Sequence, residues 1–403
     1  MNDRKLGIAI IGLGGAVGTT MVAGIELLKK DKIGTEGLPL ANLDENLIKD
    51  LANYENIIFG GWDLFGEHLA KAAEEHDVLT HKQFVAIEED LRKIKPWRAV
   101  GNKEFLANIE GENQFAAADS HRETIEKIRA DLQIFKKSCD SAVVINLAST
   151  EKLADEGNEI FNSIADFEKA LDANSKEISP AMLYAYAAIS EQIPYGNFTP
   201  SVSADIPALI EFAEKSGVPI AGKDGKTGQT MIKSVLAPAF KTRALKVEGW
   251  YSTNILGNRD GLALSNADSL ASKVKTKSSL LDDILGYTVE DHLVDIRYYR
   301  PRGDNKEAWD NIDLTGFLGQ SMQLKVNFLC KDSILAAPLA IEIARCLNLA
   351  KRRNESGVLE EVGVFFKFPM TRQKDKKPEN ALHRQEEILL KWLTGARTAR
   401  PPV

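Results

Sequence analysis

Short apolar runs alternate with amphipathic segments over the first half of the chain. Short apolar runs bounded by turn residues are typical of buried strands, and longer segments with helical periodicity are typical of the crossovers between them. On this basis we expect strands over 6–11, 56–62 and 141–147, and helices over 17–30, 67–78 and 120–138. Strands joined through helices lie parallel, so the first half predicts an α/β domain with a doubly wound sheet.

The pattern changes after about residue 226. Strands are expected over 246–253, 291–299 and 321–330, with polar and apolar residues alternating. In the last of these the apolar residues Met322, Leu324, Val326, Phe328 and Cys330 face one way, and Ser321, Gln323, Lys325 and Asn327 face the other. Such alternation indicates a sheet with one buried face, and hence a different domain.

From residue 333 the chain returns to long helical segments. We expect helices over 333–350 and 379–392 around one apolar strand over 362–368. The tail is therefore expected to return to the first domain. This gives a division into 1–225 and 332–403, which together form the first domain, and an inserted domain over 226–331.

Composition narrows the possible partners. The chain has 403 residues, 44% of them hydrophobic and 27% charged, with a net charge of -7, which suits two or three domains with a substantial core. An acidic balance gives no reason to expect nucleic acid or an anionic membrane as a partner. The three cysteines form no CxxC pair and the six histidines show no metal-ligand spacing, so we expect reduced thiols in the cytoplasm.

The apolar run 6–28 near the N-terminus is not expected to be a signal or a membrane span. It holds six glycines, and Glu26 would lie uncompensated in lipid. No later stretch is expected to approach the length and apolar character of a membrane span either.

The glycines of this run lie between a predicted strand and a predicted helix. Gly12, Gly14, Gly15 and Gly18 depart by one residue from the spacing GxGxxG. Backbone N–H groups at such a turn, at the start of a helix, suit a pyrophosphate. A plain structural turn is the alternative. No acidic residue for a ribose follows at the usual distance, and Asp63 at the end of the next strand is the best replacement.

A second series of motifs follows downstream. It comprises "AGKDGKTGQT" (221–230), "STNILGNRDGLAL" (252–264), "SKVKTKSS" (272–279), "RPRGDNK" (300–306), "CKDSILAAP" (330–338) and "FFKFP" (365–369). In this order the motifs resemble the inositol-1-phosphate synthase family. "GLGGAVGTT" (12–20), "GGWD" (60–63) and "NLASTE" (146–151) resemble the NAD-binding motifs of that family. The resemblance spans nearly the whole chain.

The resemblance implies a Rossmann domain, completed by the C-terminal tail, with an inserted α/β domain for catalysis and tetramerisation. It implies a homotetramer that binds NAD and converts glucose 6-phosphate to inositol 1-phosphate without net redox change. The steps implied are oxidation at C5, enolisation at C6, intramolecular aldol closure and reduction at C5. Whether a divalent or a monovalent cation assists is left open.

The resemblance also implies roles for individual residues. It implies catalytic roles for Asn254, Asp260, Lys273, Lys277, Lys306, Asp332 and Lys367. It implies NAD contacts for Gly12, Gly14, Gly15, Ala16, Val17, Gly18, Asp63, Ala148, Ser149, Thr150, Asp224, Asn258, Asp260, Asp304, Asp332 and Ser333. It implies substrate contacts for Thr227, Gly228, Gln229, Thr230, Leu256 and Lys277, where the start of a helix would receive the phosphate.

Simpler interpretations stand beside these roles. In a chain with 51 basic residues most lysines are solvated, and Thr227 could serve only as a helix N-cap. The chain also departs from the family pattern. Ala16 and Val17 stand where eukaryotic members usually have two asparagines, and Lys223 stands where aspartate is common. Ser149 is a weaker cofactor assignment than Thr150.

Two other functions remain open from the sequence. One is an NAD-dependent sugar-phosphate dehydrogenase, which also needs a nicotinamide, phosphate contacts and a lysine. The other is a non-catalytic dinucleotide-binding protein, which would need no ordered set of lysines in another domain. Identification of the product distinguishes them.

Overall fold

Seven parallel strands form the larger of two sheets in the computed structural model, which describes residues 4–106, 109–257, 279–373 and 376–395. The strand order is β11-β6-β5-β4-β1-β2-β3. The strands are β1 (Leu6–Ile11), β2 (Ile57–Asp63), β3 (Trp97–Arg98), β4 (Ser141–Asn146), β5 (Tyr195–Asn197), β6 (Pro219–Ala221) and β11 (Gly357–Val358). This is the doubly wound order, in which the chain changes direction between β1 and β4, and it confirms the expected α/β class.

Strand β1 explains why the sheet is covered on both faces. All six of its residues are buried. Leu6, Ile8 and Ile10 enter one core and Ala9 and Ile11 enter the other. Parallel strands that are buried on both faces have continuous apolar sequences. This pattern predicted β1 with its observed bounds.

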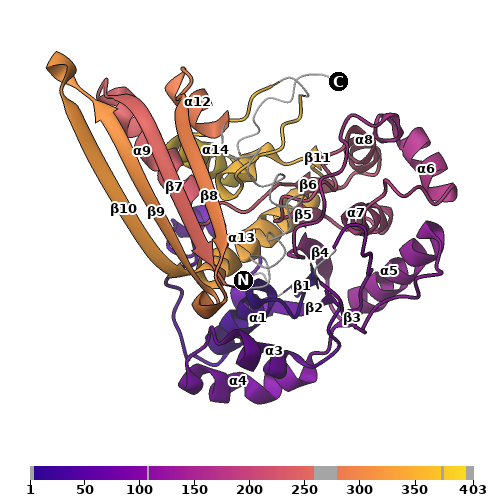
Figure 1. The fold of residues 1–403 in the computed structure, drawn as a ribbon. Coiled ribbons are helices and arrows are strands. Elements are labelled where there is room, and N and C mark those ends of the chain that lie inside the picture. The colour runs from indigo at the N-terminus through magenta and orange to yellow at the C-terminus, as the bar shows by residue number, and fades with distance from the viewer. Residues whose placement is uncertain (1–3, 107–108, 258–278, 374–375, 396–403) are drawn as a thin grey trace.

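Helices cover the two faces of this sheet in separate layers (Figure 1). One layer contains α1 (Ala16–Lys29), α3 (Leu69–His76), α4 (His81–Lys93), α13 (Asp332–Arg352) and α14 (Leu382–Leu393), with the short α2 (Glu45–Ile48) beside it. The other contains α5 (His121–Lys136), α6 (Ile164–Asp172), α7 (Pro180–Ser190) and α8 (Pro207–Lys215). Short 3-10 turns are η1 (Tyr54–Asn56), η2 (Glu159–Phe161), η3 (Arg300–Arg302), η4 (Phe317–Gly319) and η5 (Glu360–Phe365).

Helix α13 brings the tail back to the first sheet. It packs against α1 and its residues lie in the same core as β1, and the following strand β11 pairs with β6. By length and hydropathy alone α13 could cross a membrane, contrary to the expectation that no later stretch approaches a span. However, 78% of its most apolar window is buried inside the protein, which marks it as a core helix.

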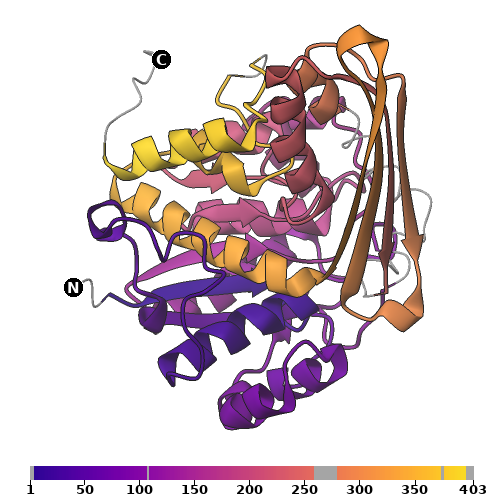
Figure 2. The same ribbon diagram turned by 90° about the vertical axis from the view of Figure 1, so that its left-hand side faces the viewer.

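The second sheet has four strands in the order β10-β9-β7-β8 and stands along one side of the molecule (Figures 1 and 2). Its strands are β7 (Lys246–Leu256), β8 (Asp291–Tyr298), β9 (Asn305–Thr315) and β10 (Ser321–Lys331). Helices α9 (Gln229–Thr242) and α12 (Ser279–Leu285) pack on its inner face, where Trp250, Ile312 and Leu281 form a third core. Figure 2 shows this helical layer between the sheet and α14.

Two expectations about this half of the chain were incomplete or wrong. Strand β9, central in the sheet, was not predicted, because a buried charge, Asp310, interrupts its apolar face. The expected strand over 362–368 is wrong. Glu360–Phe365 is a 3-10 turn, and the extended residues after it pair with the loop at Lys223–Gly225. A short apolar run alone does not distinguish a strand from another buried segment.

Strand β10 alternates as expected but lies at the edge of its sheet. Leu324, Val326 and Phe328 are only half-buried, and Met322 is 43% exposed. The helices cover β7 and β9 more fully than they cover this edge.

A buried charge network attaches the segment 31–56, which connects α1 to β2, to α13. The Glu342 carboxylate is fully buried and accepts hydrogen bonds from the Leu40 N–H (3.3 Å), the Tyr54 hydroxyl (2.5 Å) and the Arg345 guanidinium (2.6 Å). The guanidinium also stacks 3.9 Å from the centre of the Tyr54 ring. The network thereby joins this segment to α13, beside the buried Leu40 and Leu51 of the same segment.

We expect Glu342→Ala to lower the free energy of unfolding by about 3–5 kcal/mol, because the Arg345 charge would be left buried without its partner. Urea denaturation followed by circular dichroism measures this change. Glu88→Ala is the matched control: its pair with Arg92 on α4 is largely exposed and should contribute less than about 1 kcal/mol. Equal effects of the two substitutions would contradict the role of the network.

Candidate active site

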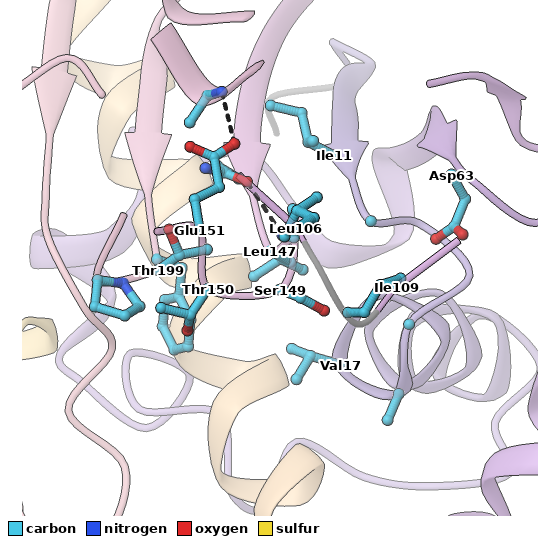
Figure 3. A pocket seen from close by; sticks show the side chains of 18 of the residues that line it. Ile11, Val17, Asp63, Leu106, Ile109, Leu147, Ser149, Thr150, Glu151 and Thr199 are labelled. Carbon is cyan, nitrogen blue, oxygen red and sulfur yellow. Dashed lines mark hydrogen bonds between the residues drawn. The ribbon is translucent and has the colours of Figure 1, made fainter. Parts of the chain in front are cut away.

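One pocket lies at the carboxyl ends of β1, β2 and β4, where the strand order reverses (Figure 3). Ligands of open α/β sheets bind at this position. The pocket extends from the glycine turn to residues of the inserted part and of the tail, including Thr227, Lys306, Asp332 and Lys367. Most of the described residues that the sequence predicted for the cofactor and for catalysis therefore line this pocket; those that do not are Gly14, Gly18, Asn254, Asp304 and Ser333.

The glycine turn forms one wall of the pocket. Gly12 has a positive φ of 85°, and a Cβ there would lie 3.1 Å from the backbone of Ala148. Helix α1 begins at Ala16, and a Cβ on Gly18 in its first turn would lie 2.6 Å from the Leu13 carbonyl oxygen. The irregular spacing therefore still gives a tight turn and a close helix start. Ala16 and Val17 line the pocket without polar side chains, so backbone groups supply the polarity here.

Asp63 holds this turn. It lies at the end of β2 and is 7% exposed. Its Oδ2 accepts the Gly14 N–H at 2.8 Å, and its Oδ1 accepts the Phe65 N–H at 3.0 Å. An acid at the end of the second strand is where doubly wound dinucleotide folds place the ribose-binding carboxylate.

The segment after β4 forms the floor between Asp63 and Glu151, which lie on opposite sides of the pocket in Figure 3. The Asn146 side chain accepts the Ala148 N–H at 3.1 Å and so bends the chain after the strand. Ser149 and Thr150 line the pocket, and Thr150 is 2% exposed.

Glu151 is buried behind this floor. Its Oε1 accepts the N–H of Ala181, in the first turn of α7, at 3.0 Å. Burial raises the pKa of the Glu151 carboxyl to about 7, against the opposing effects of the Ser179 hydroxyl and the Ala181 N–H.

Two lysine–carboxylate pairs form the opposite end of the pocket. Lys367 Nζ lies 2.7 Å from Oδ1 of Asp224, and both side chains are buried. Lys306 Nζ lies 3.2 Å from Oδ1 of Asp332, which also accepts the Thr227 hydroxyl at 3.3 Å. The ammonium groups are thus held in fixed positions by chain segments from three parts of the sequence.

The start of α13 is built around Asp304. This side chain accepts the Ser333 hydroxyl at 2.7 Å and the Ser333 N–H at 3.2 Å. The Asp304 carbonyl oxygen accepts the Asp332 N–H at 3.1 Å. Asp304 and Ser333 are buried and act on the site through Asp332, rather than lining the pocket themselves.

Helix α9 begins at Gln229, with Gly228 as its N-cap and no capping side chain. The simpler interpretation of Thr227 as the N-cap is therefore wrong, because its hydroxyl donates to Asp332 instead. The Gln229 amide is buried and accepts from Asn254 Nδ2 at 2.9 Å. Thr230 and Leu256 are also buried nearby in the inserted part.

The positive charge of Lys223 is neutralised locally. Its Nζ lies 2.5 Å from Oδ2 of Asp205, and both side chains are 12% exposed. Lys226, three residues on, is buried and hydrogen-bonded to Gln385 of α14. Burial lowers the pKa of Lys226 to about 7, against the opposing charge of Glu379.

Some predicted residues lie outside this geometry. Asn258, Asp260, Lys273 and Lys277 lie outside the described residues. The sequence reasoning in turn missed His76, whose Nε2 lies 2.8 Å from the Gly14 carbonyl oxygen. It also missed several apolar and polar pocket residues, namely Leu106, Ile109, Tyr184, Phe198 and Thr199. No short motif marks them, since folding alone brings them to the pocket.

A metal centre of side chains is not evident in the part of the chain that the structure describes. Among those residues there is no group of three or more His, Cys, Asp or Glu side chains placed to hold a metal ion.

A doubly wound sheet with a glycine turn, joined in one pocket to lysine–carboxylate pairs, defines an NAD-binding enzyme fold. The chain matches the family model described as myo-inositol-1-phosphate synthase, of an NAD-binding class, over residues 38–394. The protein therefore belongs to the myo-inositol-1-phosphate synthase family.

Individual relatives agree with this membership. The chain is 42% identical to inositol-3-phosphate synthase 1 of Bacteroides thetaiotaomicron, over 99% of this chain and 97% of the relative. Its fold superimposes on the crystal structure of inositol-3-phosphate synthase from Caenorhabditis elegans with a TM-score of 0.90 and 27% identity, covering 98% of this chain and 86% of that one. A myo-inositol-1-phosphate synthase-related protein from Thermotoga maritima matches with a TM-score of 0.80 and 25% identity, covering 97% and 98%.

We expect Asp63→Ala to weaken NAD binding by about 1–3 kcal/mol, because a carboxylate that accepts hydrogen bonds at the cofactor end of the pocket is lost. Isothermal titration calorimetry with NAD measures the change, and circular dichroism checks that the fold persists. The control is Asp131→Ala. Asp131 lies on α5, and its carboxylate accepts a hydrogen bond from Trp62 Nε1 of β2, the strand that ends at Asp63. An NAD affinity unchanged by Asp63→Ala would leave Asp63 with a structural role alone.

Proposed function

We propose that this protein is an NAD-dependent inositol-3-phosphate synthase that cyclises D-glucose 6-phosphate to 1L-myo-inositol 1-phosphate. The observation that carries the proposal is the single pocket that joins a dinucleotide-type glycine turn to two lysine–carboxylate pairs. Its family and the names of its curated relatives agree with this activity.

The pocket residues fit NAD. The turn at Gly12 brings backbone close to the pocket, the start of α1 directs N–H groups toward a pyrophosphate, and Asp63 can accept a ribose hydroxyl. Ala148, Ser149 and Thr150 would contact the part of NAD that lies over β4, together with Asp224 on the far side. When bound, NAD would accept a hydride from C5 of the sugar and return it to the same carbon.

The lysines would manage the charges that develop on the substrate. Lys306 and Lys367 each present an ammonium group beside a carboxylate, and their side chains are 15% and 9% exposed. Preorganised ammonium groups stabilise oxyanions at the carbonyl and enolate oxygens, and a lysine Nζ can hold or release a proton during enolisation and ring closure. We assign these tasks to Lys306 and Lys367 together with Lys273 and Lys277.

The N-terminus of α9 would receive the substrate phosphate. Its first N–H groups have no partner within the helix, and a helix start favours negative charge. A Cβ on Gly228 would lie 3.9 Å from Lys306 Nζ, so this helix start and the ammonium group face one region. Thr227 and Thr230 add hydroxyls at the same turn.

The proposal also covers the roles of the two domains, the oligomeric state and the cellular location. The inserted part, 226–331, would carry the substrate contacts and the tetramer contacts, while 1–225 and 332–403 would bind NAD. We propose a homotetramer in the cytoplasm, with a divalent or monovalent cation as an assisting ion. The basis for the tetramer is the outer face of the four-stranded sheet, where Tyr251, Leu293 and Leu329 are 38%, 57% and 58% exposed.

The amounts of product and of NADH formed per NAD supplied distinguish the synthase from a dehydrogenase. With NAD supplied near the enzyme concentration and glucose 6-phosphate in large excess, inositol phosphate should accumulate far beyond the NAD added. The NADH absorbance should stay at or below the enzyme concentration, since the hydride returns to C5. Phosphorus and proton NMR identify the product, and a reaction without NAD is the control. A dehydrogenase would instead stop after one equivalent of NADH with an acyclic or lactone product, and a binding protein would give no product.

The tetramer is tested on the outer sheet face. Leu293→Asp should lower the sedimentation coefficient, because a charge on an exposed apolar residue opposes burial in an interface. Asp295→Asn, two residues along the same strand, is the matched control and should leave assembly unchanged. A parent protein that sediments as an active monomer would overturn the proposed tetramer.

A further inference from the structure

A buried carboxylate lies behind the start of α9, outside the pocket. Asp310 is fully buried in the middle of β9. Its Oδ1 accepts three hydrogen bonds, from Trp250 Nε1 (2.7 Å), Ser252 Oγ (2.7 Å) and Gln229 Nε2 (3.2 Å). An ionised side chain in such a position is costly unless hydrogen bonds compensate it, so its place in the fold needs a reason beyond packing.

The third donor connects this carboxylate to the helix start. Gln229 is the first residue of α9 and is 4% exposed. Its amide nitrogen donates to Asp310 and its amide oxygen accepts from Asn254. Both ends of the side chain are thus used by the protein, and Gln229 acts as a tether between α9 and the strands β9 and β7.

No side chain caps the N-terminus of α9. The N-cap is Gly228, and the preceding Thr227 hydroxyl donates to Asp332. The hydrogen bonds of Gln229 therefore tie the turn that carries the first N–H groups of α9 to strands β9 and β7. These are the N–H groups that the proposed function assigns to the substrate phosphate.

A buried lysine, whose charge interacts with that of Asp310, belongs to the surroundings of this carboxylate. Lys233, one turn further along α9, is 2% exposed, and its Nζ lies 2.6 Å from His292 Nε2 on β8 and 5.6 Å from the centre of the Trp250 ring. Trp250 in turn donates to Asp310. Strands β7, β8 and β9 and helix α9 thus share one polar cluster.

We propose that Asp310 is a positioning residue for the substrate phosphate: through Gln229 it fixes the N-terminal turn of α9 in the orientation that binds the phosphate. This inference rests on the proposed function. Asp310 does not touch the substrate. Its charge strengthens the hydrogen bond to Gln229, because hydrogen bonds to ionised acceptors are stronger than those to neutral ones.

The direction in which Asp310→Asn changes phosphate binding distinguishes a positioning role of Asp310 from a direct effect of its charge. A buried negative charge behind a phosphate site repels the phosphate, so if charge alone mattered, Asp310→Asn would improve binding. If Asp310 acts by holding Gln229, the same substitution weakens binding. We expect a KM for glucose 6-phosphate and a dissociation constant that are about tenfold higher, with kcat within about threefold and NAD affinity unchanged.

A double-mutant cycle tests the route through Gln229. Gln229→Met removes the tether with little change in volume and should also raise KM. The double variant Asp310→Asn with Gln229→Met should be no worse than Gln229→Met alone, since both changes break one connection. Multiplying effects would overturn the proposal, because Asp310 would then act independently of Gln229.

Controls keep the test interpretable. Asp313→Asn lies on the same strand but on the exposed face, where its partners are Asn311 and Gln323, and it should leave KM unchanged. If Asp310→Asn fails to fold, Gln229→Met alone decides: an unchanged KM there overturns the proposal.

Calorimetry of glucose 6-phosphate with the NAD-loaded protein separates this inference from the proposed function. A parent protein that binds the sugar phosphate but makes no inositol phosphate would refute the function, while the Asp310 effect on binding would still be measured.

Discussion

The direct junction between β10 and α13 is the constraint on which the rest of the structure depends. The strand ends at Lys331 and the helix begins at Asp332, with no loop between them. One end of this continuous unit belongs to the four-stranded sheet, and the other is buried in the core of the seven-stranded sheet. The two sheets are therefore held in one relative orientation by covalent structure and by burial together.

The active-site pairs use this fixed orientation. Asp332 lies at the junction itself and pairs with Lys306 of the neighbouring strand, while Asp224 and Lys367 join the end of the first domain segment to the tail. Under the proposed function the ammonium groups must stay aligned with a reacting sugar, and a rigid junction between the two sheets would keep them in place.

The sequence predicted the parts whose signals are local. A run such as Leu6–Ile11 is apolar on both faces and appears as a strand with its correct ends. The glycine turn and Asp63 were found because the residues that follow a buried strand are the ones that reach the edge of the sheet. The family motifs then identified the lysines that line the pocket, and their individual roles remain predictions.

The parts that the sequence did not predict depend on contacts between distant residues. The central strand β9 carries Asp310 on its buried face, where Trp250, Ser252 and Gln229 donate hydrogen bonds to it. The strands β5, β6 and β11 have two or three residues, too few to show any periodicity. Near the pocket, His76 reaches the glycine turn from 62 positions along the chain.

The Lys223–Asp205 pair has a consequence for how this site could vary between relatives. An aspartate at position 223 would place a second carboxylate against Asp205 in a largely buried location. Two carboxylates so close would need a counter-ion, which here the lysine ammonium supplies from within the chain. Positions 205 and 223 therefore form one electrostatic unit, and we expect evolution to exchange them together rather than one at a time.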